Sequence, residues 1–126
     1  MIDCVVIDDD EMTLDVFCDL LNANNINVVG KGSNGKEAVS LYKKYNPDII
    51  FIDFVMPKYD GLYAILNIKK FHSDAKIVVI TGVNKLSESY FHDILQVSGV
   101  IYKPFELKTV KEMIDATLFE LNALEQ

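Results

Sequence analysis

The chain has 126 residues, of which 50% are hydrophobic and 25% are charged, as expected of one globular domain over residues 1–126 that needs no disulfide or metal to fold. Twelve lysines, no arginine and nineteen acidic residues give a net charge of −7, which argues against nucleic-acid binding by this chain. No apolar run approaches the length of a membrane span, and no leader-like segment opens the chain, so we expect no membrane association and a cytoplasmic protein.

Five short apolar runs, each with the length of a β-strand, recur along the chain. They are continuously apolar rather than alternating in polarity, which is typical of parallel strands with helices on both faces of the sheet. The expected strands are residues 4–7, 26–29, 49–52, 77–80 and 100–102.

Helical patterns fill the intervals between these runs. Asn34, Asp60 and Asn84 stand where N-caps are expected, and apolar residues follow at helical spacing. The expected helices are residues 11–24, 35–45, 61–71, 85–97 and 106–124. The alternation predicts a doubly wound α/β fold, (βα)5, around a five-stranded parallel sheet.

Polar residues follow the expected strands at their carboxyl ends, where ligands bind in a doubly wound sheet. They are Asp8, Asp9 and Asp10 after the first strand, Asp53 after the third, Thr81 after the fourth and Lys103 after the fifth. If these strands are neighbours, the carboxylates repel one another unless a cation compensates, and Mg²⁺ is the ion that prefers such oxygen ligands. Carboxylate, metal, hydroxyl and amine together indicate a phosphoryl-transfer site in which Asp53 is the nucleophile and forms an acyl phosphate.

Short motifs surround these strand ends. They are Asp8-Asp9, Asn34-Gly35-Lys36-Glu37-Ala38, Pro47-Asp48 before the third strand with Asp53 at its end, Met56-Pro57, Asp60-Gly61, Thr81, and Lys103-Pro104-Phe105. At these residues, and over essentially its whole length, the sequence resembles the receiver domain of two-component response regulators. The resemblance implies a flavodoxin-like fold with strand order 2-1-3-4-5 and a cis peptide bond before Pro104.

The resemblance also implies a function in a phosphorelay. Asp53 would take a phosphoryl group from the phosphohistidine of a sensor histidine kinase or of a histidine phosphotransfer domain. Mg²⁺ would bind Asp9, Asp53 and the backbone carbonyl of Val55, with Asp8 holding a water on the ion. The remaining two site residues, Thr81 and Lys103, would bind the phosphoryl oxygens.

Such a domain is a phosphoacceptor that assists its own phosphorylation and dephosphorylation rather than an enzyme. The resemblance implies an effector or output domain as downstream partner, and a dimer that depends on phosphorylation.

The sequence departs from the receiver pattern at positions that affect switching and hydrolysis. Val100 occupies the place of the usual aromatic reporter residue, while Tyr102 either fills space on the last strand or contacts a partner. Gly82 replaces a customary alanine and loosens the loop after the fourth strand. Val55 and Val83 are apolar and cannot hold an attacking water, so we expect slow loss of the phosphoryl group.

The loop between the second strand and its helix carries a second phosphate-binding pattern. Residues 30–35 spell G-x-G-x-x-G, and with Lys36 they resemble a phosphate loop. However, this loop follows the second strand, an edge strand in the expected order, whereas nucleotide fingerprints open the first unit. We therefore interpret it as a glycine-rich turn that leads into a helix capped by Asn34.

Two further functions remain open. The D-x-D pattern at Asp8 also occurs in aspartyl-phosphate phosphatases of the haloacid-dehalogenase type, whose nucleophile would be Asp8 rather than Asp53. Alternatively, the chain is a receiver-like interaction module that is never phosphorylated, in which case an exposed Phe119 on the last helix is a candidate docking residue.

Cysteines and histidines do not form a site. Cys4 and Cys18 are expected to be buried thiols, because two cysteines are too few for a disulfide framework or a zinc site. His72 and His92 are expected to be solvated on helix faces.

Overall fold

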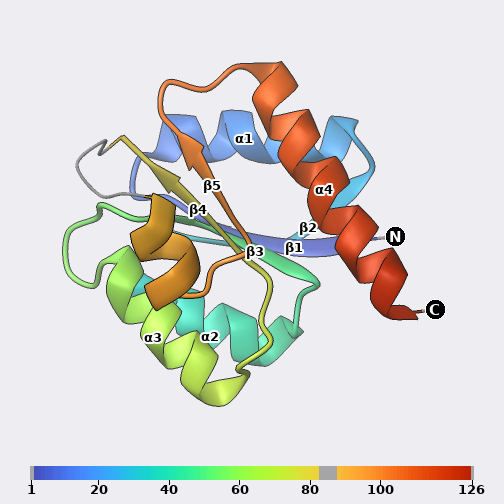
Figure 1. The fold of residues 1–126 in the computed structure, drawn as a ribbon. Helices are drawn as coiled ribbons and strands as arrows, with labels where there is room; N and C mark the ends of the chain where they lie inside the picture. Colours follow the sequence, from blue (N-terminus) through green and yellow to red (C-terminus); the bar gives the residue numbers. More distant parts are fainter. Residues whose placement is uncertain (1, 83–87, 126) are drawn as a thin grey trace.

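The computed structural model describes residues 2–82 and 88–125, and its centre is a parallel sheet with strand order β2-β1-β3-β4-β5 (Figure 1). This confirms the predicted doubly wound fold and its strand order. The strands are β1 (Ile2–Ile7), β2 (Ile26–Gly32), β3 (Ile49–Asp53), β4 (Ile77–Thr81) and β5 (Gly99–Tyr102).

The register of the strands places their last residues side by side. Ile7 of β1 pairs with Ile52 of β3, so the next residue on each strand, Asp8 or Asp53, falls at the same edge of the sheet. Thr81 closes β4 beside Tyr102 of β5, one residue before Lys103. The four site positions therefore converge because the strands end at the same level.

Helices cover both faces of the sheet. Figure 1 shows α1 and α4 on one face, and α2, α3 and the short gold helix η1 on the other. Their bounds are α1 (Glu11–Ala23), α2 (Gly35–Tyr45), α3 (Gly61–Phe71), η1 (Tyr90–Ile94) and α4 (Leu107–Glu125). No helix in the described parts of the chain is both long enough and apolar enough to cross a membrane.

Side-chain caps fix where three helices begin. Asp10, Asn34 and Asp60 each accept a hydrogen bond from a backbone N–H in the first turn of α1, α2 and α3. The predicted caps at Asn34 and Asp60 are thereby confirmed, while Asn84 lies outside the described residues.

The fourth helical segment ends earlier than predicted. Residues 85–97 were expected to be helical, but the described part of this segment is helical only to Ile94 and ends in the π-helix η1, in which the N–H of Leu95 donates to the carbonyl of Tyr90 at 3.1 Å. Leu95 and Val97 are both buried, and on a helix they would point about 200° apart. The left-handed conformation of Gln96, with φ of 56°, ends the helix and lets both side chains reach the core.

The core is split into two clusters, one on each face of the sheet. Alternate strand residues enter the two clusters, as Val5 and Cys4 of β1 do, which explains why the strands read as continuously apolar. Cys4 and Cys18 are both buried, as predicted, and burial raises the pKa of the Cys4 thiol to about 12. Both cysteines therefore act as apolar core groups.

The two histidines differ in their surroundings. His92 is exposed on η1, as predicted. The prediction for His72 was incomplete, because this exposed residue follows the end of α3 and its Nδ1 lies 2.8 Å from the hydroxyl of Tyr42. The fully buried ring of Tyr42 needs a partner for its hydroxyl, and His72 supplies it.

Candidate functional site

Four side chains from four strand ends meet at the carboxyl edge of the sheet. Asp8 follows β1, Asp53 ends β3, Thr81 ends β4 and Lys103 follows β5. Asp8 is 4% exposed, Asp53 5% and Thr81 0%, although strand ends in a small domain usually face water. The structure thus brings the predicted acidic, hydroxyl and amine groups to one largely dehydrated edge.

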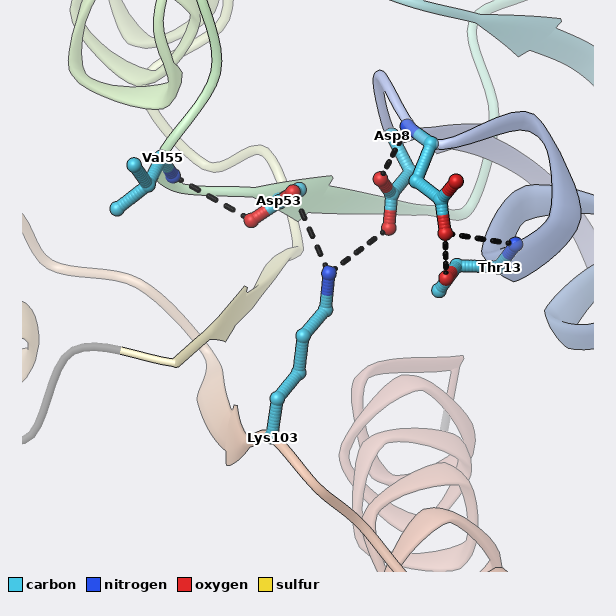
Figure 2. A network of polar contacts seen from close by, with 6 residues as sticks. Asp8, Thr13, Asp53, Val55 and Lys103 are labelled. Atoms are coloured by element: carbon cyan, nitrogen blue, oxygen red, sulfur yellow. Dashed lines mark hydrogen bonds and ion pairs between the residues drawn. The ribbon is translucent and has the colours of Figure 1, made fainter.

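Lys103 joins the two buried carboxylates. Its Nζ lies 3.1 Å from Oδ2 of Asp8 and 3.4 Å from Oδ2 of Asp53 (Figure 2). The backbone N–H of Lys103 donates to the carbonyl of Thr81 at 2.8 Å, which fixes the start of the side chain beside β4. The peptide bond between Lys103 and Pro104 is cis, as the sequence predicted.

The turn after β1 gives its three aspartates different roles. Asp8 accepts a hydrogen bond from the backbone N–H of Asp10 at 2.9 Å. Asp10 instead caps α1 through the hydroxyl and the N–H of Thr13, and the hydroxyl hydrogen bond lowers the pKa of Asp10. Asp9 is exposed, and its carboxylate remains available to a ligand. The sequence alone could not show that Asp10 is the one of these three aspartates that caps α1.

A tight loop after β3 holds Asp53 in place. The N–H of Val55 donates to Oδ1 of Asp53 at 3.3 Å, and Figure 2 shows this nitrogen turned toward the carboxylate. Gly61 donates its N–H to the carbonyl of Phe54 at 3.0 Å. A Cβ at Gly61 would lie 2.6 Å from the Cα of Phe54, so only glycine permits this approach of α3.

Burial and charge shift the pKa values of the central pair. Burial raises the pKa of Asp53 to about 6, and the charge of Asp8 adds to the rise while Lys103 opposes it. Burial alone would lower the pKa of Lys103, but its hydrogen bond to Asp8 and the charges of both carboxylates raise it above the ordinary value. The site therefore holds a charged ammonium and more negative charge than this ammonium balances.

The donor set suits a hard divalent cation. Asp8, Asp9 and Asp53 each offer a carboxylate oxygen, and these oxygens lie within 4.8 Å of one another. Carboxylate oxygens with open positions for water are the ligands that Mg²⁺ prefers. The residues present fit the ion that the sequence predicted.

The described residues that depart from the receiver pattern have different surroundings. The side chain of Val55 is 55% exposed, while Val100 is 9% exposed within the core cluster on the α2 and α3 face. Tyr102 packs against the same cluster, in agreement with its space-filling interpretation. Val83 and the side chain of Phe119 lie outside the described residues, so the expectations for them stay predictions.

Sequence reasoning did not identify one aromatic contact beside the site. The ring of Phe54, the residue after Asp53, meets the ring of Phe91 in η1 edge-on, with centroids 5.1 Å apart. An aromatic residue directly after the expected acceptor was the available signal, but its partner comes from a segment far away in the sequence.

Packing explains the glycines of the G-x-G-x-x-G pattern. Gly32 lies in the edge strand β2, where a Cβ would come within 2.8 Å of the side chain of Ile7. A Cβ at Gly35 would collide with the backbone oxygen of Asp60. The Asn34 side chain accepts from the N–H of Glu37 at 2.9 Å, which confirms the predicted cap of the helix. The glycine-rich turn was predicted too long, because Gly30 and Gly32 belong to β2 and only Ser33 and Asn34 separate this strand from α2.

Comparisons of the sequence with known proteins agree with this geometry. A family model described as the response regulator receiver domain matches residues 4–115. The chemotaxis protein CheY of Bacillus subtilis is 32% identical over 116 residues, which cover 90% of this chain and 95% of that protein. The transcriptional regulatory protein LiaR of Bacillus subtilis is 34% identical over 119 residues, which cover 92% of this chain and 54% of LiaR.

Solved structures show the same fold. The CheX-CheY-BeF3-Mg²⁺ complex from Borrelia burgdorferi matches with a TM-score of 0.85 and 26% identity, over 93% of this chain and 89% of that chain. The REC domain of AraT, a response regulator from Geobacillus stearothermophilus, matches with a TM-score of 0.87 and 24% identity, over 99% of this chain and 98% of that chain.

Proposed function

Because the chain belongs to the response regulator receiver domain family of two-component systems, we propose that it accepts a phosphoryl group on Asp53 and changes its partner binding in response. One observation carries the choice of Asp53. Strand β3 lies between β1 and β4, so Asp53 has acidic groups on one side and Thr81 on the other. Asp8, by contrast, follows β1, whose neighbours are β2 and β3, so it does not adjoin the strand that carries Thr81.

The chemistry is an in-line transfer from nitrogen to oxygen. A carboxylate oxygen of Asp53 attacks the phosphorus of a phosphohistidine, the P–N bond breaks, and the imidazole leaves with the electron pair. Negative charge spreads over the three phosphoryl oxygens. The ammonium of Lys103, 3.4 Å from Asp53, and the hydroxyl of Thr81 would bind these oxygens.

Mg²⁺ would be held by Asp8, Asp9, Asp53 and the backbone carbonyl of Val55. When bound, the ion supplies positive charge that neutralises the carboxylates and the phosphoryl oxygens. The residues themselves keep water out, since Asp8 and Asp53 are almost fully buried. The related CheY from Borrelia burgdorferi is in a complex with CheX, BeF3 and Mg²⁺, which supports Mg²⁺ as the ion by similarity.

We further propose that residues 1–126 act as one receiver domain in the cytoplasm, where a sensor histidine kinase or a histidine phosphotransfer domain supplies the phosphoryl group. The output partner is an effector protein or a linked output domain, and phosphorylation would also favour a dimer. LiaR, of which the chain covers 54%, is named a transcriptional regulatory protein, which supports an output domain in part of the family.

Mapping the labelled residue tests the proposal. The protein is incubated with acetyl phosphate and Mg²⁺, trapped with borohydride, digested and analysed by mass spectrometry. We expect one modification, on Asp53, that is lost in Asp53→Asn and kept in the matched control Asp60→Asn. Label on Asp8 would instead support the phosphatase-type chemistry, and absence of label would support an interaction module.

A further inference from the structure

A cavity lies at the amino ends of strands β4 and β5, opposite the acidic site at their carboxyl ends. It has a volume of about 580 Å³ and is lined by residues from the end of α3, the segment that enters β4, and η1 with the segment that follows it. Its lining residues are Lys69, Ser73, Asp74, Ala75, Lys76, His92, Gln96, Val97 and Ser98. Because β4 is five residues long, this cavity lies roughly 15 Å from the acidic edge.

The charge of this cavity is opposite to that of the whole chain. Lys69 and Lys76 contribute two ammonium groups, and Asp74 is the one acid that lines the cavity. His92 adds an imidazole to the lining.

The two ammonium groups affect each other. Burial lowers the pKa of Lys69, and the charge of Lys76 lowers it further, while Asp74 acts in the opposite direction. The Nζ of Lys69 donates to the carbonyl of Ser73 at 3.1 Å, which holds the ammonium at the wall of the cavity. An anion between the two lysines would relieve their repulsion.

The rest of the lining contains hydrogen-bond donors and two buried apolar residues. Ser73, Ser98 and Gln96 line the same space and carry hydroxyl and amide groups that can donate hydrogen bonds. Ala75 and Val97, 2% and 6% exposed, form the floor. The N–H of Ser98 donates to the carbonyl of Ile77 at 2.8 Å, so this wall is held by the sheet.

We propose that this cavity is a binding site for a small phosphate-bearing anion. Two ammonium groups, hydroxyl donors and an imidazole are the groups that bind a tetrahedral dianion. A volume of about 580 Å³ exceeds the need of inorganic phosphate and leaves room for a phosphate monoester. This site is separate from the phosphoryl acceptor at Asp53 and does not depend on the function proposed for it.

Titration with inorganic phosphate tests the site on the full chain. Amide resonances are followed by ¹⁵N NMR at constant ionic strength, in EDTA, with chloride as the reference anion. We expect saturable shifts at Ser73, Gln96 and Ser98 and none at Asp53. Phenyl phosphate forms a second arm: tighter binding than phosphate identifies a phosphate ester as the ligand class, and equal binding identifies free phosphate.

Variants that replace one lysine with an uncharged residue distinguish binding at this site from nonspecific attraction of anions to lysine. Lys69→Met and Lys76→Met should each weaken phosphate binding at least about tenfold, because each removes a charge-assisted hydrogen bond. Lys70→Met is the matched control, since Lys70 is exposed on the same helix but does not line the cavity. If one lysine variant fails to fold, the other decides. Shifts without saturation, or equal binding in all three variants, would overturn the proposal.

Discussion

The ammonium of Lys103 lies 3.4 Å from a carboxylate oxygen of Asp53, although 50 residues separate them in the sequence. The same ammonium lies 3.1 Å from Asp8, so one cation balances two buried acids. The two buried carboxylates are stable side by side only while Lys103, or another cation in its place, lies next to them. The site therefore favours the binding of cations.

Replacement of Lys103 tests this balance. Lys103→Met should lower the free energy of unfolding by about 1–3 kcal/mol at pH 7.5 in EDTA, because it leaves two buried carboxylates unpaired. Urea denaturation gives the measurement. Millimolar Mg²⁺ should restore most of the loss. The control is Lys108→Met, whose side chain is 83% exposed and should change stability little. A variant as stable as wild type without Mg²⁺ would show that Lys103 does not compensate the acids.

The pKa of Asp53 predicts how stability depends on pH without metal. Its value in the folded protein is about 6, above the ordinary 3.8, so folding favours the protonated acid. Below about pH 4 the acid is protonated in both states and contributes nothing. As pH rises to about 6 the unfolded chain loses this proton first, and the folded state loses up to about 3 kcal/mol of stability.

Asp53→Asn isolates this contribution, because asparagine does not titrate. The difference in unfolding free energy between Asp53→Asn and wild type should grow from about pH 4 to about pH 6 in EDTA and then level off. Urea denaturation at several pH values provides the curve. A difference that is flat across this range would contradict the raised pKa.

Mg²⁺ should stabilise the fold before any phosphorylation. Binding at ten times the dissociation constant adds about 1.4 kcal/mol, so the melting temperature should rise with millimolar Mg²⁺. Asp9→Ala should blunt this rise without harming the apo fold, since Asp9 is exposed. The control Asp19→Ala removes an equal charge from the exposed face of α1 and should keep the full response. An unchanged response in Asp9→Ala would remove Asp9 from the ligand set.

The strand ends were predictable because they depend on local patterns. Continuous apolar runs located the strands, and the residue after each run located Asp8, Asp53, Thr81 and Lys103. Parallel strands then bring those ends to one edge whatever the details of the helices. The cap residues Asn34 and Asp60 were predictable for the same reason, because a cap binds a backbone N–H in the first turn of its own helix.

Features that depend on tertiary packing were not predictable. The end of η1 before the left-handed Gln96 lets both Leu95 and Val97 be buried, and no local propensity encodes this. The bond between His72 and Tyr42 joins two helices, and the ring contact of Phe54 with Phe91 joins a loop to a helix. In each case the sequence shows one partner without indicating the other.

The lifetime of the acyl phosphate is expected to depend on Val55. Its N–H contacts Asp53 at 3.3 Å, while its 55% exposed side chain offers no hydrogen bond to an attacking water. Val55→Asn and Val55→Glu keep the backbone contact and add a polar group, so hydrolysis should accelerate by roughly tenfold, which is less than the roughly 10²- to 10⁴-fold effect of a well-positioned general acid or base. Decay of labelled protein in Mg²⁺, without kinase, gives the rate. Val16→Asn is the matched control, because Val16 is similarly exposed on α1, and it should decay like wild type. If wild type decays as fast as the polar variants, Val55 does not limit the access of water, and the loop that begins at Gly82 becomes the next place to change.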